Sequence, residues 1–81
     1  MQLVDTVELM LSNDYKDRFK GEYFQVKERY ERLRKMVVRY QAGTLSFEPK
    51  CDLELLKSQL SAMRDYLYVL EVRAQIEGIE L

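Results

Sequence analysis

The sequence predicts an all-α protein: an antiparallel two-helix hairpin, packed like a coiled coil, with a short N-terminal helix and assembled as a homo-oligomer. The main observation is an apolar stripe with spacings that alternate between three and four: Leu53, Leu56, Leu60, Met63, Leu67, Leu70 and Ala74. Such spacing lets one helix pack lengthwise on another. A second stripe of matched length precedes it: Phe19, Tyr23, Val26, Tyr30, Leu33, Val37 and Tyr40. Two such stripes joined by a short connector are typical of a helical hairpin.

The size of the chain predicts the oligomer. With 81 residues, it buries too little surface to be stable without disulfides, a metal ion or a partner subunit. Its one cysteine, Cys51, cannot form an intrachain disulfide, and one thiol without any histidine does not make a structural zinc site. We therefore expect a single helical domain over residues 1–81 that self-associates, with no metal ion and no cofactor.

Residues 1–12 are predicted to form an N-terminal arm that contains a short helix. Its apolar residues share one helical face: Leu3, Val4, Val7, Met10 and Leu11. A helix of this length is not stable alone, so we expect this face to dock on another element, in cis or in a partner chain. The polar residues that follow the arm are good helix N-caps and mark a restart of the chain.

The first long helix is predicted over residues 14–42, with Gly43 as the residue that terminates it. Gly21 lies inside this helix, where glycine costs about 1 kcal/mol relative to alanine. Two interpretations stay open. Gly21 is either a tolerated surface residue or a point at which another backbone approaches closely.

The connector is predicted over residues 43–51 and the second long helix over residues 52–77. Leu45 and Phe47 are expected to cover the open end of the hairpin. Gly78 ends the second helix, and the residues after it form an apolar tail.

An antiparallel register places Tyr40 beside Leu53 and Phe19 beside Ala74. The same register sets cations opposite one another on one side of the hairpin, which we call the cationic flank: Lys27 opposite Arg64, and Arg34 opposite Lys57. Like charges placed this way are mildly destabilising when they are solvated. The flank is either solvated surface or an anion site in which two arginines and two lysines bind phosphates.

The second helix carries another apolar row, which we call the outer row. Its members are seven residues apart and lie away from the hairpin stripe: Leu55, Ala62, Val69 and Ile76. One partner helix cannot cover both the stripe and the outer row. We expect a second copy of the chain to cover it. The alternative is coverage by the N-terminal arm.

Polar and aromatic residues of the second helix supply further candidates for ligand contacts. Tyr66 and Arg73 form a polar stripe that either makes a structural network with Glu22 and Arg29 or recognises a ligand. Arginine and tyrosine can both stack on a nucleobase. Tyr68 is a candidate for surface contacts of the same kind.

Several function classes are disfavoured. A net charge of −1, with 33% charged residues of both signs, argues against a general nucleic-acid or membrane-surface binder. The sequence has no apolar run that could span a bilayer and no signal-peptide pattern, so a cytoplasmic protein is expected. Without histidine, a metal-binding cluster or a glycine-rich phosphate loop, an enzyme is not expected.

Two patterns resemble a family of small phage and prophage proteins known from crAss-like phages. The second helix carries Leu55-Leu56-x-x-Gln59-Leu60-x-x-Met63-x-x-Tyr66-x-x-x-Leu70-x-x-Arg73. The first carries Arg18-Phe19-x-x-Glu22-Tyr23-x-x-x-Lys27-x-Arg29-Tyr30-x-x-Leu33. The resemblance covers about residues 14–81 and implies a short helical hairpin without enzyme activity.

The layout is also similar to that of phage sponges, which blunt CBASS and Thoeris immunity by sequestering cyclic nucleotide signals. By this analogy of fold, the chain is expected to be a phage anti-defence protein of the host cytoplasm that binds a cyclic oligonucleotide or cyclic ADP-ribose type signal without cleaving it. Its expected ligand contacts are Lys27, Arg34, Lys57, Arg64, Tyr66, Tyr68 and Arg73. The alternatives are a protein–protein adaptor or inhibitor that uses the outer row, and a nucleic-acid accessory protein.

Overall fold

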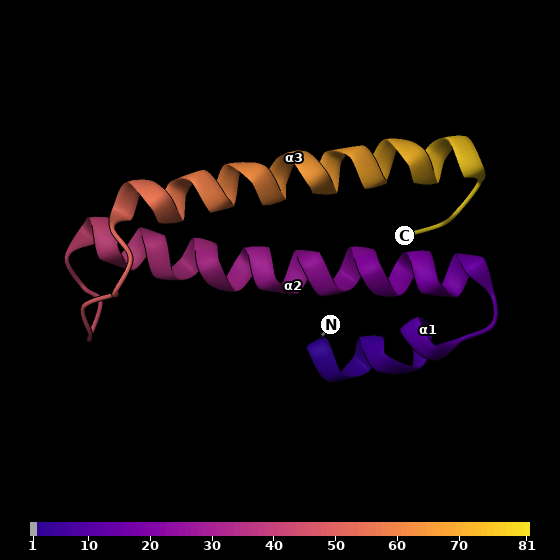
Figure 1. Cartoon of the computed structure of the whole chain (residues 1–81), viewed down its shortest axis with the longest axis horizontal. Helices are drawn as coiled ribbons and strands as arrows, with labels where there is room; N and C mark the ends of the chain where they lie inside the picture. Colours follow the sequence, from indigo (N-terminus) through magenta and orange to yellow (C-terminus); the bar gives the residue numbers. More distant parts are fainter. Residues whose placement is uncertain (1) are drawn as a thin grey trace.

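The computed structural model describes residues 2–81, so residue 1 of the predicted arm lies outside the described residues. Four helical segments follow one another: η1 (Leu3–Thr6, a 3-10 helix), α1 (Val7–Leu11), α2 (Tyr15–Ala42) and α3 (Leu53–Glu77). Figure 1 shows α2 in the middle, with α3 antiparallel to it on one side and the N-terminal arm on the other. The molecule measures 43 × 24 × 16 Å. Because a helix with its side chains is about 10–12 Å across, this is nearly a single layer of helices.

Helix capping sets the ends of the two long helices. Asp14 and Asp52 precede α2 and α3, and each carboxylate accepts a hydrogen bond from a first-turn backbone N–H, at 2.9 and 2.7 Å. They are N-caps, so both helices begin one residue after the predicted starts. Gly43 and Gly78 follow the helices with φ of 77° and 70°, a left-handed conformation that glycine adopts without strain.

The predicted stripe of α3 is confirmed residue by residue. Among the residues of α3, the seven that are not exposed are the seven that the heptad spacing selects. Six of the buried apolar residues form one cluster where the start of α2 meets the end of α3: Phe19, Tyr23, Leu67, Leu70, Ala74 and Ile79. Val37 and Leu56 are buried toward the other end of the hairpin. Leu70 is 0% exposed. The core is therefore concentrated at one end of the hairpin rather than spread evenly along it.

The antiparallel register is confirmed by contacts between the long helices. The Tyr15 hydroxyl donates to the Glu77 carboxylate at 2.8 Å, and the Tyr23 hydroxyl donates to Glu71 at 3.2 Å. Each pair lies within one residue of the register that the two stripes predict. The register brings Arg34 of α2 together with Lys57 and Arg64 of α3 on one side of the hairpin, as expected.

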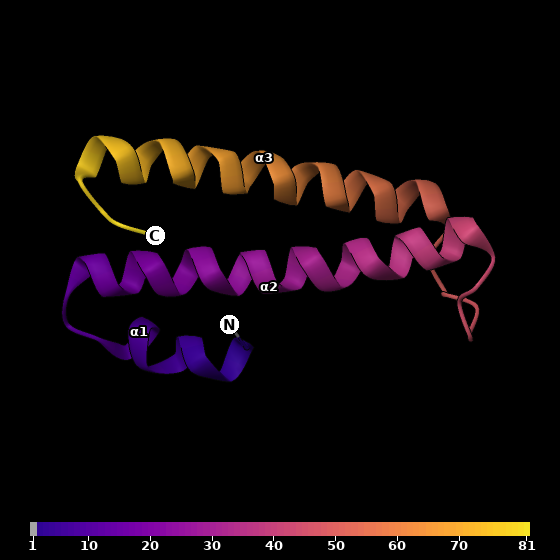
Figure 2. The same ribbon diagram turned by 180° about the vertical axis from the view of Figure 1, so that it is seen from behind.

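The arm docks on α2, on the side away from α3 (Figure 1, Figure 2), but the face it uses is not the predicted one. Val4, Val7 and Leu11 are exposed, whereas Thr6 is fully buried and Leu9 is partly buried. The reason is that the arm starts as a 3-10 helix, whose period of three residues replaces the α-helical period. Thr6 tolerates burial because its hydroxyl donates to a backbone carbonyl at 2.6 Å.

Gly21 is the point at which the arm approaches α2. A Cβ atom on Gly21 would lie 2.8 Å from Cγ of Met10, 3.1 Å from Cβ of Leu9 and 3.1 Å from the backbone nitrogen of Met10. Of the two interpretations of this glycine, close approach by another backbone is confirmed. The helix accepts the propensity cost of glycine because the arm needs the space.

We expect Gly21→Ala to loosen the arm while leaving the hairpin folded. Alanine improves the helix propensity of α2 by about 1 kcal/mol. However, its Cβ clashes with backbone as well as side-chain atoms of the arm, so the arm must shift. Hydrogen exchange should then accelerate in residues 3–11 and stay unchanged in α3. Unchanged exchange in the arm would contradict the close-packing argument.

The connector and the tail differ from expectation. Leu45 is partly buried, but Phe47 is 57% exposed, so the prediction that Phe47 covers the end of the hairpin is wrong. Ile79 turns back into the core at 5% exposure, held by a 2.8 Å hydrogen bond from its N–H to the carbonyl of Ala74. Within residues 2–81, no helix is both long and apolar enough to cross a membrane.

Candidate functional site

Three of the four cations of the cationic flank line one cavity between α2 and α3. The cavity has a volume of about 250 Å³ and lies beside the buried stripe. Its walls combine the cations with polar and apolar groups: Tyr30, Arg34, Val37, Val38, Gln41, Lys57, Leu60, Ser61 and Arg64. We call it the cationic cavity. No carboxylate lines it among the described residues.

Helix geometry explains the convergence. Lys57 and Arg64 are seven residues apart, so they lie on the same side of α3 about 10 Å apart along its axis. Arg34 reaches the cavity from α2. A carboxylate oxygen of Glu54 lies 4.0 Å from Nζ of Lys57, and one of Asp65 lies 4.0 Å from Nε of Arg64. Both distances are at the limit of an ion pair, and the side chains are exposed. Such pairs contribute little, so the cations keep most of their capacity to bind an anion.

Lys27, the fourth member of the cationic flank, lies outside the cationic cavity. It lines a separate hollow of about 190 Å³ with Phe24, Glu28 and Glu31. Its ammonium lies 5.8 Å from the centre of the Tyr23 ring, within the range of a cation–π contact. Lys27 therefore has an aromatic face and two carboxylates around it.

The structure does not bring Tyr66 and Arg73 to the cationic cavity. Tyr66 is two residues from Arg64, which turns it about 200° away around α3. The Tyr66 hydroxyl donates to the carboxylate of Glu22. Of the structural network that one interpretation predicts for this stripe, the Tyr66–Glu22 bond is present, whereas Arg29 makes no hydrogen bond among the described residues.

Arg73 is fixed by the start of α2. Its guanidinium donates to the Tyr15 hydroxyl at 2.9 Å and to Glu77 at 3.3 Å, and it lies 5.1 Å from the centre of the Phe19 ring. The hydrogen bond from Tyr15 to Glu77 raises the pKa of the Tyr15 phenol, which keeps that hydroxyl protonated as a donor. These bonds tie the ends of α2 and α3 together.

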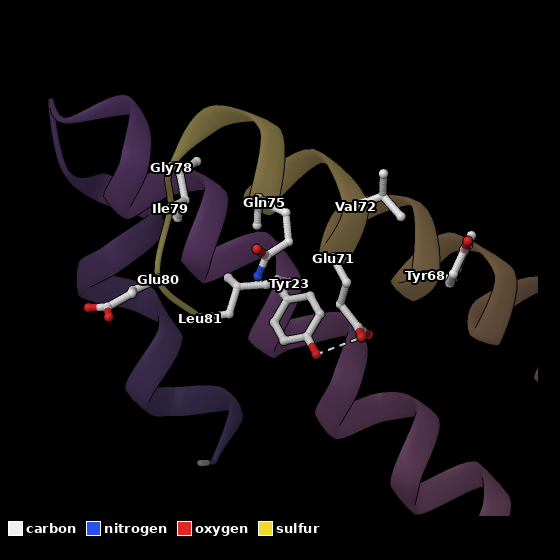
Figure 3. Close-up of a pocket in the computed structure, with 10 residues that line it drawn as sticks. Tyr23, Tyr68, Glu71, Val72, Gln75, Gly78, Ile79, Glu80 and Leu81 are labelled. Carbon is white, nitrogen blue, oxygen red and sulfur yellow. Dashed lines mark hydrogen bonds between the residues drawn. The ribbon is translucent and has the colours of Figure 1, made fainter.

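A larger pocket lies where the tail folds back over the hairpin (Figure 3). It has a volume of about 770 Å³ and combines aromatic, polar and apolar walls: Tyr23, Tyr68, Glu71, Val72, Ala74, Gln75, Gly78, Ile79, Glu80 and Leu81. We call it the tail pocket. Tyr68 is the predicted site residue that lines it, and it is 67% exposed.

Sequence reasoning missed the tail pocket, including Glu71 and Gln75. The pocket exists because the chain reverses at Gly78 and buries Ile79, which the heptad pattern does not predict. A helix-ending glycine followed at once by an isoleucine is the signal that could have indicated the reversal. Burial raises the pKa of Tyr23, and the Glu71 carboxylate that accepts its hydrogen bond raises it further.

Residues 13–76 match the Sequestin family. The match spans well over half of the chain, including α2, the connector and nearly all of α3. This chain belongs to the Sequestin family. Neither a comparison with curated proteins nor one with solved structures gave a match.

The name Sequestin suggests a sequestering, non-catalytic protein. The Sequestin match contains every residue of the cationic cavity, together with Tyr68, Glu71 and Gln75 of the tail pocket. The N-terminal arm and the tail lie outside it. Within residues 2–81, no group of three or more histidine, cysteine, aspartate or glutamate residues could hold a metal ion. What the arrangement offers chemically is anion binding beside an aromatic pocket.

Proposed function

We propose that this protein binds and sequesters a phosphorylated nucleotide signal, of the cyclic oligonucleotide or cyclic ADP-ribose type, without cleaving it. We further propose that it is a phage anti-defence protein, similar in layout to the phage sponges, that acts in the host cytoplasm. The observation that carries the proposal is the convergence of Arg34, Lys57 and Arg64 on one cavity that no described carboxylate lines.

The composition of the cationic cavity supports phosphate as the group that is bound. Arginine offers planar, forked donors that pair with two phosphate oxygens at once, and lysine adds a point charge. Ser61 and Gln41 add neutral donors to the wall. A volume of about 250 Å³ is below the range of about 300–1,000 Å³ for whole small-molecule sites. The cavity therefore suits the phosphate part of a ligand that extends beyond it.

Tyr68 is the better candidate to stack on a base. Tyr68 and Arg64 are four residues apart, so they are neighbours on one side of α3. The Tyr68 ring is largely exposed, and its hydroxyl makes no hydrogen bond to the other described residues. Tyr66 is engaged with Glu22 on the other side of the hairpin, so we leave Tyr66 and Arg73 out of the proposed contacts.

The lining of the cationic cavity supports binding without cleavage. Hydrolysis of a phosphodiester needs an activated nucleophile, and activation needs a nearby base or a metal ion. Ser61 is a hydroxyl in the wall, but it accepts a hydrogen bond from Arg64 at 3.5 Å, and among the described residues no base lines the cavity beside it. Positive charge and neutral donors hold a phosphate ester without attacking it.

The outer row supports self-association. Leu55, Val69 and Ile76 are 59%, 51% and 79% exposed. The arm packs on α2 and makes no contact with α3 in the described part of the chain, so coverage of the row by the arm is wrong. We propose that a second copy of the chain covers the outer row, because the nearly single-layer fold has little core of its own. The same exposed row would favour the adaptor function if no ligand binds.

Titration calorimetry with a panel of cyclic dinucleotides, cyclic trinucleotides and cyclic ADP-ribose isomers tests the ligand proposal. At least one of them should bind. Arg64→Ala should weaken that binding by about 1–3 kcal/mol, the range for a hydrogen bond to a charged group. The same change should slightly raise the melting temperature of the free protein, because it relieves repulsion among the cations.

Arg29→Ala is the matched control, because Arg29 is an exposed arginine of α2 that lines neither the cationic cavity nor the tail pocket. It should leave binding unchanged. If no ligand gives a heat of binding at tens of micromolar, or if Arg64→Ala binds as tightly as the wild type, the ligand proposal is rejected and the adaptor function is favoured.

A further inference from the structure

Tyrosine hydroxyls of the hairpin donate to glutamates across the two long helices. Three such pairs are present: Tyr15 with Glu77, Tyr23 with Glu71, and Tyr66 with Glu22. Tyr30 belongs to the same packed stripe of α2 as Tyr23, and it is partly buried. Its hydroxyl nevertheless makes no hydrogen bond to another residue in the range 2–81, so Tyr30 has no glutamate of this kind.

The antiparallel register explains why Tyr30 has no such acceptor. Tyr30 follows Tyr23 by seven residues, and Arg64 precedes Glu71 by seven. Seven residues are about two helical turns, so Tyr30 has the same relation to Arg64 that Tyr23 has to Glu71. A guanidinium only donates hydrogen bonds, whereas a carboxylate accepts them. The position opposite Tyr30 therefore holds a second donor in place of an anionic acceptor.

The hydroxyl of Tyr30 is accessible to a ligand. Within residues 2–81, every buried side-chain nitrogen or oxygen atom has a hydrogen-bond partner, so the unpartnered hydroxyl of Tyr30 is in contact with solvent. Tyr30 lines the cationic cavity, while its ring packs against the buried cluster at the start of α2. This packing restrains the side chain before a ligand arrives, which lowers the entropic cost of forming a new hydrogen bond.

We propose that Tyr30 is a further ligand-binding residue, whose hydroxyl donates a hydrogen bond to the phosphate that Arg64 binds. This inference rests on the proposed function, since the phosphate is that of the sequestered ligand. Phosphate oxygens are strong acceptors that take several charge-assisted hydrogen bonds at once. One phosphate thus satisfies both donors, and it supplies to Tyr30 the anionic acceptor that Glu71 supplies to Tyr23.

The neighbours of Tyr30 locate this phosphate at one end of the cationic cavity. Arg34 follows Tyr30 by four residues, so the two are neighbours on one side of α2. Ser61 lies one helical turn before Arg64 on α3 and accepts a hydrogen bond from it at 3.5 Å. This end of the cavity is also the nearer one to Tyr68, which follows Arg64 by one turn. A phosphate held there leaves the rest of the ligand beside the tyrosine that we propose as its stacking partner.

Tyr30→Phe tests the inference, because it removes the hydroxyl and keeps the ring that packs against the core. The probes are the cyclic dinucleotides, cyclic trinucleotides and cyclic ADP-ribose isomers of the calorimetric panel. Each one that binds the wild type should bind the variant about 10- to 100-fold more weakly, the effect of losing a hydrogen bond to a charged group. The melting temperature of the free protein should not fall, since the hydroxyl has no partner to lose.

The salt dependence of binding separates the role of Tyr30 from that of the cations. Salt screens the attraction between charged groups. Tyr30→Phe removes a neutral donor, so the loss of affinity should be similar at low and high salt. Arg64→Ala removes a charge, so its loss should be largest at low salt. A change that merely disturbed the packing of the hairpin would instead lower the melting temperature.

Tyr40→Phe is the matched control. Tyr40 is also a partly buried tyrosine of the α2 stripe whose hydroxyl makes no hydrogen bond to the other described residues. It lines a hollow beside the connector, with Gly43 and Leu45, and not the cationic cavity. Tyr40→Phe should therefore bind every probe as the wild type does. An equal loss in Tyr40→Phe and Tyr30→Phe would overturn the inference.

The remaining outcomes separate this inference from the proposed function. If Tyr30→Phe binds as tightly as the wild type while Arg64→Ala binds more weakly, Tyr30 has no role in binding and the proposed function stands. If no probe binds the wild type, or if Arg64→Ala binds as tightly as the wild type, the proposed function is rejected and this inference with it.

Discussion

Leu70→Ala is expected to lower the free energy of unfolding by about 2–5 kcal/mol, the range for truncation of a buried leucine. Leu70 is 0% exposed and sits in the cluster where the start of α2, the end of α3 and the tail meet. Because the fold is nearly one layer thick, few other side chains can move in to fill the cavity. Leu67→Ala, in the same cluster, should cost a similar amount.

Leu60→Ala provides the comparison. Leu60 belongs to the same heptad stripe, but it is only partly buried and lines the cationic cavity. Removing it should cost clearly less than removing Leu70, although the sequence alone predicts similar costs at every central position of the stripe. Urea melts at one fixed protein concentration measure both, since self-association would make stability depend on concentration. A cost below 1 kcal/mol for Leu70→Ala would mean that this end of the hairpin is not the core.

The hairpin could be predicted because the apolar residues that pack its two helices together recur at a regular spacing. Heptad spacing in both stripes selects the packed faces, and Asp14, Gly43, Asp52 and Gly78 mark the helix ends with side chains or glycines suited to capping. These signals are local. Each can be read within a few residues, so tertiary contacts do not change them.

The arm and the tail could not be predicted in the same way. An α-helical period assigns Val4, Val7 and Leu11 to the buried face, but the 3-10 start of the arm buries Thr6 instead. Whether a five-residue helix begins with a 3-10 turn depends on the surface on which it docks. Gly21 provides that surface. The sequence alone does not distinguish it from a glycine that is merely tolerated in a helix.

The candidate site was predictable in part. The register alone brings Arg34, Lys57 and Arg64 together, because opposed positions on two packed helices follow from the stripes. Lys27 was grouped with them by the same reasoning, yet it lies over the ring of Tyr23. Whether a cation joins the cavity depends on the direction of its side chain and on its neighbours, and the helix register determines neither.

The tail pocket illustrates the same limit. Glu71 and Gln75 read as ordinary polar residues of an exposed helix face until the chain folds back after Gly78. Tyr66 shows the converse case. Its ring is a plausible base-stacking group in the sequence, but its hydroxyl is bound by Glu22, so it serves to hold the two helices together.

Val69→Glu is expected to dissociate the homo-oligomer that we propose. Val69 is at the centre of the outer row and is 51% exposed in the single chain. In an assembly that covers this row, the new carboxylate would be buried without a partner, which is strongly destabilising. In the free chain it would remain in water, so the hairpin itself should stay folded. Light scattering at micromolar concentration should show an oligomer for the wild type and a monomer for the variant.

Leu11→Glu is the control that locates the interface. Leu11 is 78% exposed and belongs to α1, which lies on the opposite side of α2 from α3, the helix that carries the outer row (Figure 1, Figure 2). If the outer row is the interface, Leu11→Glu leaves the oligomer intact, because its charge stays in solvent. Dissociation by Leu11→Glu alone would instead place the interface on the arm. A wild-type chain that is monomeric at micromolar concentration would reject self-association and leave the outer row free for a different protein, as the adaptor function requires.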